Sequence, residues 1–280
     1  MTSLVPIEPD AAFIATLREA LAKSSPSRRR QVAEKVVLAA LGSIPWVGGV
    51  LSILAGIPGE KRGAHADDIR TKWLEEHERK LELLRLTLDE MQRRFDALGD
   101  TVAERIESDE YLAIVRQAFK AWDNAETAEK RGYAANLVTN AAGTRASSDD
   151  VVRLFIDWLD VYHEAHFAVI RHIYANPGAT RFDIWSTIYG QLPREDSSEA
   201  DLFKMLIRDL STGGVIRQER DTNALGQFVR KQPAKRRDRV PTVMKSAFDD
   251  EEHYVLTELG RRFVHYTLTD AVGRLADGAA

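Results

Sequence analysis

The side chains with the greatest potential for chemistry lie on one stretch between Asp157 and His166. Their spacing along a helix would let Asp160 approach a metal ion together with His163 or Glu164. A di-metal helical bundle needs a comparable set of ligands on a second helix, and the sequence has no such set. The pattern favours an ordinary surface between domains, so we predict neither a metal site nor a cofactor.

The sequence also lacks the short motifs of the common enzyme classes. It has no Gly-Lys-Ser/Thr loop for phosphates, no Gly-x-Ser-x-Gly elbow and no dinucleotide fingerprint. The absence of cysteine excludes disulfides, cysteine–zinc sites and thiol catalysis, and it fits a reducing cytoplasm. Glu8 and Asp10 stand where an export signal would need positive charge. We therefore expect a cytoplasmic protein that is not an enzyme.

One segment has the charge that phosphate binding requires. Because the net charge of the chain is −4, any such surface must be a local cluster. Within residues 230–239 of the long segment 218–253, six cations are opposed only by Asp238, and an acidic run follows at 249–252. A surface for nucleic acid, a surface for an anionic membrane and a solvated loop all fit this pattern. The predicted nucleic-acid-binding residues are Arg230, Lys231, Lys235, Arg236, Arg237 and Arg239.

The elements around this segment follow a recognisable order. Apolar periodicity predicts a helix at 166–176, a short helix capped by Thr180 and a third helix at 200–210. Strands are expected at 215–217 and 254–256, with a last helix directly after them. This order is that of a winged helix, and the alternative is a helical bundle with an incidental hairpin. The expected core residues of the second and third helices are Phe182, Ile184, Trp185, Ile188, Leu202, Phe203, Leu206, Ile207 and Leu210.

The end of this region resembles a segment that closes many bacterial winged-helix domains. The chain reads YVLTELGRRFVHY from Tyr254, which is similar to the pattern Tyr-x-Leu-Thr-x-x-Gly. Thr257 then caps the last helix, and Gly260 permits close packing. The third helix, in contrast, is disfavoured as a reader of bases, because carboxylates near its start would repel phosphates. The four carboxylates and the three opposing cations are Glu195, Asp196, Glu199, Asp201, Arg194, Lys204 and Arg208.

Residues 36–59 contain no charged side chain, and Pro45 with Gly48 and Gly49 interrupts them. The stretch is long enough to cross a bilayer, but these breaks favour two short helices joined at a bend. We weigh two interpretations: a hairpin buried among amphipathic helices, which is favoured, and a membrane-active element that is covered at rest. The residues expected to form it are Ile44, Pro45, Trp46, Val50, Leu51 and Leu54.

Residues 67–98 carry a heptad pattern and predict one long helix. Such a seam requires partner helices, either within the chain or from a second copy in a homodimer. The seam residues are Leu74, Leu81, Leu84, Leu88, Met91, Phe95 and Leu98.

Two further helices are expected between Asp109 and Ala142, followed by a linker near 143–150. The predicted fold is mainly α. A helical domain at 1–145 contains the apolar hairpin (36–59) and the heptad helix (67–98), and a winged-helix domain at 150–280 contains a small antiparallel wing with a long basic loop.

The order of these parts resembles bacterial proteins of the abortive-infection alpha family. The matching features are the turn Ile44–Gly49, the charged heptad helix, the segment ESDEYLAIVRQAFKAWDNAETAEKRGYAANLVTNA and the winged helix after it. The resemblance implies antiviral defence by shutting down phage-infected cells, with no catalytic residues. We favour an effector whose winged helix senses a protein trigger or nucleic acid and whose N-terminal helices act on the inner membrane. The alternative is a non-catalytic, DNA-binding transcriptional regulator.

Overall fold

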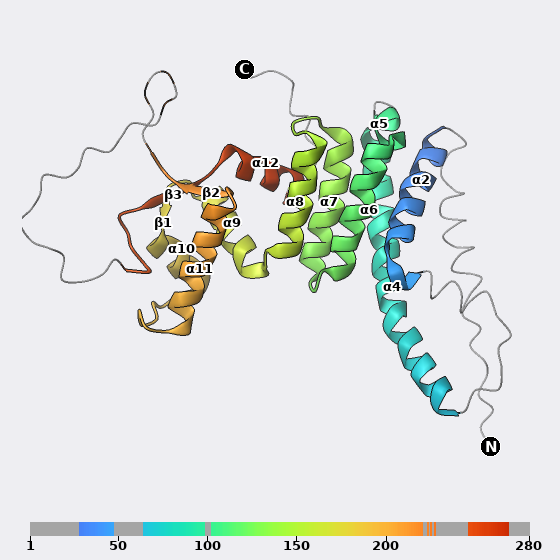
Figure 1. The fold of residues 1–280 in the computed structure, drawn as a ribbon, viewed down its shortest axis with the longest axis horizontal. Helices are drawn as coiled ribbons and strands as arrows, with labels where there is room; N and C mark the ends of the chain where they lie inside the picture. Colours follow the sequence, from blue (N-terminus) through green and yellow to red (C-terminus); the bar gives the residue numbers. More distant parts are fainter. Residues whose placement is uncertain are drawn as a thin grey trace, which may run out of the picture. The chain divides into compact units, whose positions relative to one another are not determined.

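The computed structural model describes residues 28–47, 64–98, 102–220 and 246–268, together with Asn223, Leu225 and Gln227. Side chains are described from Lys35 in the first range and, in the second, at 79–80 and 82–98. By contacts the chain divides into two units, Met1–Asp160 with Tyr266–Ala280, and Val161–His265. Both are helical, and the second also holds a small antiparallel sheet (Figure 1). The predicted mainly α fold is therefore confirmed.

The described part of the first unit is a bundle of helices (Figure 1). Its helices α2, α6 and α7 lie side by side, and α4 packs against α7 and α2. Ser108 caps α6 by accepting the Tyr111 backbone N–H at 3.3 Å, as Ser and Thr do at helix starts. The bounds are α2 Arg28–Ser43, α4 Ala64–Leu98, α5 Ala103–Glu107, α6 Asp109–Asn124, α7 Ala128–Gly143 and α8 Asp149–Val161.

The helix α8 belongs to the first unit up to Asp160. The sequence predicts that the C-terminal domain starts at 150, before most of this helix. Its apolar face explains the difference, because Phe155 packs its ring against Tyr266, at a centroid distance of 5.6 Å within the first unit. The final helix α12 (Glu258–Thr267) belongs to the second unit up to His265, and its last two residues belong to the first.

The first part of the apolar stretch is buried in the bundle, as the hairpin interpretation requires. Ile44 and Val47 are 2 % and 4 % exposed, whereas Pro45 is exposed. Trp46 is half-buried, and its indole N–H donates to Asp123 Oδ1 at 2.6 Å. Val50, Leu51 and Leu54 lie outside the described residues. Within the part of the chain that is described, no helix has the length and apolar character needed to cross a membrane.

The heptad helix is confirmed as α4, which spans 35 residues. The described seam residues Leu84, Leu88, Met91 and Phe95 are all buried, because α4 packs against α7 and α2 of the same chain. Leu98 is only half-buried, and the side chains of Leu74 and Leu81 lie outside the described residues. From Leu84 to Phe95 the seam thus has partner helices within the chain. The homodimer stays a prediction.

The second unit contains a three-stranded antiparallel sheet in the order β1-β3-β2. The predicted hairpin is confirmed, since Ile216 pairs with Leu256 and Gln218 with Tyr254. The short strand β1 was not predicted; it adds to the free edge of β3, where Ala179 pairs with Tyr254. The bounds are α9 Glu164–Ala175, β1 Ala179–Thr180, α10 Arg181–Tyr189, α11 Ser198–Thr212, β2 Ile216–Gln218 and β3 His253–Leu256.

The junction between the sheet and α12 depends on two residues that the sequence singled out. Thr257 Oγ1 accepts the backbone N–H of Gly260 at 2.9 Å, and it donates to the Gly214 carbonyl at 2.6 Å. A Cβ at Gly260 would lie 2.1 Å from the carbonyl oxygen of Val215. Thr257 therefore caps α12, and only glycine allows this approach of helix to strand.

Two predicted core residues of this unit are exposed instead. Phe182 is 42 % exposed and Leu202 is 46 % exposed. At 100° per residue, each lies at the edge of the buried stripe of its helix, which is centred on Ile184 and Trp185 in α10 and on Phe203 and Leu206 in α11.

Candidate functional site

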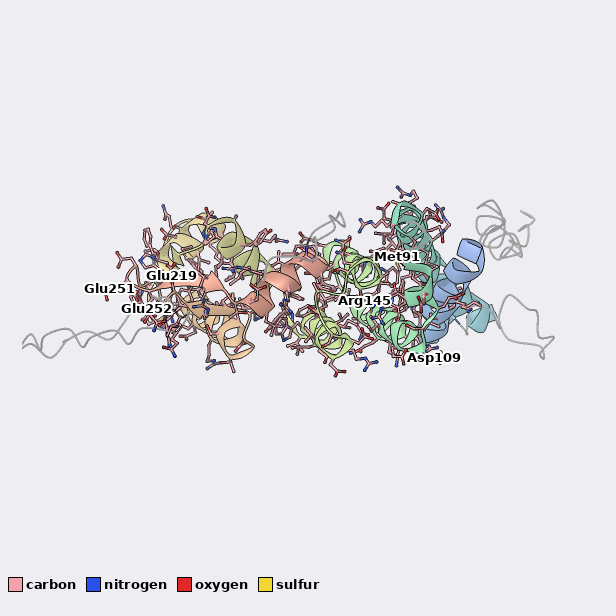
Figure 2. The ribbon with its side chains drawn as sticks, turned by 90° about the horizontal axis from the view of Figure 1, so that it is seen from above. Met91, Asp109, Arg145, Glu219, Glu251 and Glu252 are labelled. Atoms are coloured by element: carbon pink, nitrogen blue, oxygen red, sulfur yellow. The ribbon has the colours of Figure 1, made fainter. Side chains whose placement is uncertain are left out.

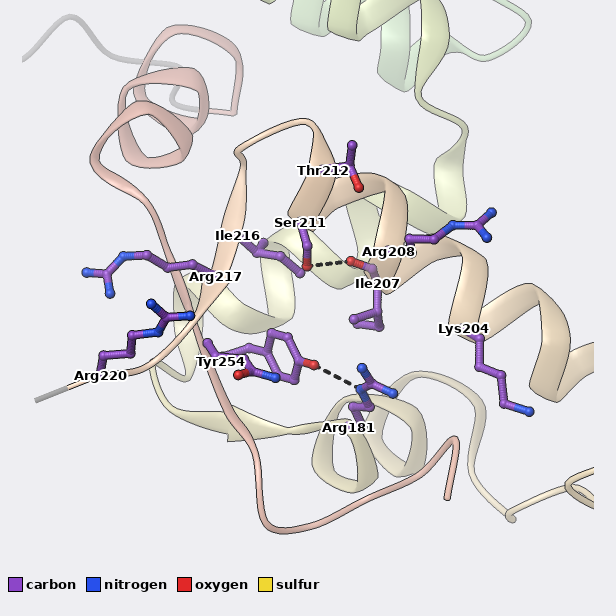
Figure 3. Close-up of a pocket in the computed structure, with 11 residues that line it drawn as sticks. Arg181, Lys204, Ile207, Arg208, Ser211, Thr212, Ile216, Arg217, Arg220 and Tyr254 are labelled. Atoms are coloured by element: carbon purple, nitrogen blue, oxygen red, sulfur yellow. Dashed lines mark hydrogen bonds between the residues drawn. The ribbon is translucent and has the colours of Figure 1, made fainter. Parts of the chain in front are cut away.

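A groove of about 520 Å³ lies between the C-terminal half of α11, the start of α10 and the β2–β3 pair (Figure 3). Ile207 and Ile216, which are almost fully buried, belong to its lining. None of the described lining residues is acidic. Its cationic residues, which we call the groove cations, are Arg181, Lys204, Arg208, Arg217 and Arg220.

The helix α11 brings two of the groove cations to one face. Lys204 and Arg208 are four residues apart, so they follow each other along the same side of the helix. Figure 3 shows both side chains projecting from α11, while Arg217 and Arg220 project from β2 and the residues after it. The Ser211 hydroxyl donates to the Ile207 carbonyl at 2.7 Å, so it is tied to its own helix. Cations from separate parts of the sequence therefore border one groove.

Arg181 is held more firmly than Lys204 and Arg208. Its Nε donates to the Tyr254 hydroxyl at 3.0 Å, and its guanidinium carbon lies 5.6 Å from the centre of that ring (Figure 3). The same hydroxyl donates to Glu252 Oε2 at 3.3 Å, and Glu252 lies 3.9 Å from the Arg181 guanidinium. Only 22 % of the Arg181 side chain is exposed. This arginine is positioned in advance for an anion.

The start of α10 fixes the backbone of Arg181. Thr180 Oγ1 accepts the Asp183 backbone N–H at 3.2 Å, and the Thr180 backbone N–H donates back to the Asp183 carboxylate at 2.9 Å. The Thr180 backbone N–H, and after it the Thr180 hydroxyl, which donates to Asp183 Oδ2 at 2.7 Å, lower the pKa of Asp183. Asp183 therefore stays anionic at the positive end of α10, and Arg181 lies at the first helical position.

Carboxylates surround the groove without lining it. Lys204 lies 3.7 Å from Asp201 and 3.9 Å from Glu195, and Arg208 lies 3.6 Å from Asp209. These separations exceed the about 2.7–2.9 Å of a charge-assisted hydrogen bond, and such exposed pairs contribute little. Further carboxylates, Glu219, Glu251 and Glu252, lie where β2 ends and β3 begins (Figure 2). The described lining of the groove itself therefore contributes cations and no carboxylate.

The acidic residues near the start of α11 have other partners. Glu195 accepts hydrogen bonds from the Ser246 hydroxyl and, at 2.9 Å, from the Ala247 backbone N–H. These contacts, the hydroxyl first, lower the pKa of Glu195. Asp196 is paired with Arg194 through two bonds of 2.8 and 2.9 Å. The expectation that this helix is a poor reader of bases stays a prediction, and the cations Lys204 and Arg208 lie beyond its acidic first turn, in the groove lining.

The predicted basic residues of the long loop fall outside the described residues. This holds for all six of them, so their role stays a prediction: Arg230, Lys231, Lys235, Arg236, Arg237 and Arg239. The sequence missed the groove because nothing in it shows that β2 lies beside α11. The available signal was the pair Lys204 and Arg208 at helical spacing, together with Arg217 and Arg220 after the predicted strand start.

The cluster between Asp157 and His166 is not assembled into one site. Asp157 accepts from the Gln117 amide at 2.8 Å, and Asp160 from the Asn124 amide at 3.4 Å. His166 is buried, and its Nδ1 accepts the His163 backbone N–H at 3.1 Å. Among the described residues, no group of three or more His, Cys, Asp or Glu side chains could hold a metal ion.

Comparison of this chain with known protein families, with curated proteins and with solved structures gives no match.

Proposed function

We propose that residues 161–265 form a winged-helix domain that binds nucleic acid in a non-catalytic protein. The order α9, β1, α10, α11, β2, β3 supports the fold. A winged helix has three helices followed by a hairpin, and a short strand after the first helix pairs with that hairpin. The observation that carries the function is the groove between the third helix and the hairpin, which five cationic residues line and to which no described acidic residue contributes.

The charge of the groove matters because the chain as a whole is not cationic. With a net charge of −4, the chain has no general attraction for a polyanion. A local row of cations binds phosphates chiefly by releasing condensed counterions, so the affinity falls as salt rises. The proposal therefore predicts a salt-dependent affinity that depends on the groove cations.

A double substitution of Lys204→Ala and Arg208→Ala tests the proposal in the full chain. Both side chains are exposed, at 43 % and 73 %, so the change should leave the fold intact. Fluorescence anisotropy with labelled DNA should show weaker binding, and the slope of log affinity against log salt should fall by about 2. The matched control is Arg194→Ala with Arg261→Ala, which removes two exposed cations of the same unit outside the groove lining.

The control should bind as the wild type does. If the wild type fails to bind duplex and single-stranded DNA at low salt, or if the groove variant and the control behave alike, the proposal is wrong. All variants keep residues 230–239, so any contribution of that basic run is constant.

We place the regulator role first, and the defence effector implied by the abortive-infection resemblance stays a prediction. An effector requires residues 36–59 to leave the first unit and reach a membrane. Val36, Val37, Ile44 and Val47 are buried in that unit, which suits a structural hairpin and equally the resting state of an effector. Both roles use the same nucleic-acid-binding domain, so the groove experiment applies to either.

A further inference from the structure

The first turn of α11 is acidic, and both cations of the helix lie in its later turns, where Asp209 follows Arg208. Glu199 and Asp201 are exposed in its first turn, whereas Lys204 and Arg208 line the groove in its later turns. Hydrogen bonds from its own backbone N–H and from the Ser198 and Ser197 hydroxyls lower the pKa of Glu199, so its carboxylate is charged at neutral pH. A recognition helix reads bases with its N-terminal residues inserted into the major groove. Here that end would bring carboxylates towards phosphates, which opposes insertion.

The groove also offers no platform for unpaired bases. Proteins that bind single strands stack the bases on exposed aromatic rings. Among the described lining residues, the only aromatic one is Tyr254, which is 2 % exposed and is held against Arg181. Phe182 and Tyr189 are exposed on α10, but neither lines the groove.

What the groove does offer is a set of donors for phosphate oxygens. Arg181 is held at one side by Tyr254, and the remaining groove cations come from α11 and from β2 with the residues that follow it (Figure 3). The Thr212 hydroxyl lies in the same lining. Such donors fix the register of a protein on a duplex but carry no sequence information.

We infer that the groove binds the sugar–phosphate backbone of a nucleic acid duplex irrespective of its sequence. The later turns of α11 and the strand β2 contact phosphates, Arg181 serves as the fixed anchor, and the first turn of α11 remains outside the major groove. This inference rests on the proposed function and specifies its ligand as a duplex of either DNA or RNA.

The first test uses the full chain with two duplexes of unrelated sequence and with one of their single strands. The affinities for the two duplexes should agree within about twofold, whereas a specific site would differ by about 10³-fold or more. The single strand should bind more weakly.

Neutralising the first turn of α11 with Glu199→Gln and Asp201→Asn should strengthen binding to both duplexes by the same factor. DNA and RNA versions of one sequence show which duplex is preferred, and tight binding of either supports the inference.

A second test concerns the anchor. Tyr254→Phe removes the hydroxyl that orients Arg181 but leaves every groove cation in place, so both duplexes should bind more weakly by an equal factor. The matched control is Tyr174→Phe, on an exposed tyrosine of α9 that does not line the groove, and it should have no effect. Thermal unfolding of both variants checks that the fold is intact. A Tyr254→Phe protein that is folded and binds as the wild type does would overturn the role of the anchor.

Failure of the inference can be told apart from failure of the proposed function. A preference for one duplex that disappears with Ser198→Ala and Glu199→Ala would show base reading by α11 and overturn the inference. Tighter binding of the single strand would overturn it as well. In both cases the loss of binding in the Lys204→Ala, Arg208→Ala protein would still uphold the groove as the binding site. No binding of any nucleic acid would overturn both.

Discussion

The side-chain amide of Asn140 donates a hydrogen bond of 3.0 Å to the backbone carbonyl of Tyr266, 126 positions later in the chain. One turn earlier in α7, the Asn136 amide donates to the Thr267 carbonyl at 2.9 Å, and Asn136 also accepts from Arg94 of α4. The last carbonyls of a helix have no partner within it, and here they are buried. Two buried asparagines therefore hold the end of α12 in the first unit.

Asn140→Leu should destabilise the first unit by about 1–3 kcal/mol, because a similar volume is kept while a buried carbonyl loses its donor. Urea unfolding followed by circular dichroism measures the change. The matched control is Asn124→Leu on the exposed end of α6, where a change within about 0.5 kcal/mol is expected. Equal effects of the two substitutions would show that the Asn140 hydrogen bond contributes little.

Gly260→Ala should lower the melting temperature, since the new Cβ would meet the Val215 carbonyl oxygen at 2.1 Å and force α12 away from β2. Overpacking of this kind costs about 1–3 kcal/mol or more. Gly132→Ala serves as a control with the opposite expected effect. Apart from the adjacent residues and the backbone of α7 itself, no atom lies within 4 Å of the Cβ position at Gly132, so this substitution should stabilise the protein by about 0.5–1 kcal/mol. A Gly260→Ala protein that melts at the wild-type temperature would contradict the close approach.

Acidification should destabilise the second unit through His166. Burial, the largest cause, lowers the pKa of this imidazole below its ordinary value of about 6.5, against the attraction of Asp209. The unfolded chain therefore takes up the proton first, and the free energy of unfolding falls as the pH drops below about 6.5 until His166 is protonated in the folded state too. Burial also lowers the pKa of His172 and His265, which add to the same trend.

His166→Asn isolates the contribution of this residue, because its amide oxygen can replace Nδ1 as acceptor for the His163 N–H. Urea unfolding at pH 7.5 and at about pH 5.5 should show a smaller loss of stability in the variant than in the wild type. An identical pH dependence would assign the trend to other groups.

Leu84→Asp should strongly destabilise the first unit, because this side chain is 1 % exposed in the seam of α4. Leu86→Asp is a matched control on the same helix, at a position that is 49 % exposed, and should change stability little.

Light scattering of the wild type tests the predicted homodimer directly. A monomer would leave α4 with the helices of its own chain as its partners.

The effector role predicts that the N-terminal region alone, expressed as residues 1–145, inhibits growth and sediments with membranes. Val50→Asp with Leu54→Asp should abolish both effects by placing charges in the apolar stretch. A harmless fragment that stays out of the membrane fraction would favour the structural hairpin and the regulator role.

Strong local periodicity explains what the sequence predicted correctly. The core face of α6, from Tyr111 to Trp122, and the seam of α4 each repeat over several turns, so their burial could be anticipated. The strand β1 has two residues and leaves no periodic signal. The groove depends on Arg181, Arg208 and Arg217 coming together through tertiary packing, and the net charge of α11 does not show that Lys204 and Arg208 lie beyond its acidic first turn.

The Glu195 contacts have a consequence for how this protein can evolve. The chain leaves the sheet after β2, and Glu195 holds Ser246 and Ala247 where the described residues resume. Phe248 then stacks on Phe203, with 10° between the ring planes. Because the fold is secured on both sides of residues 221–245, insertions, deletions and charge changes there need not displace the groove cations. Natural variation can therefore change the sequence between residues 221 and 245 while the framework that carries the groove is preserved.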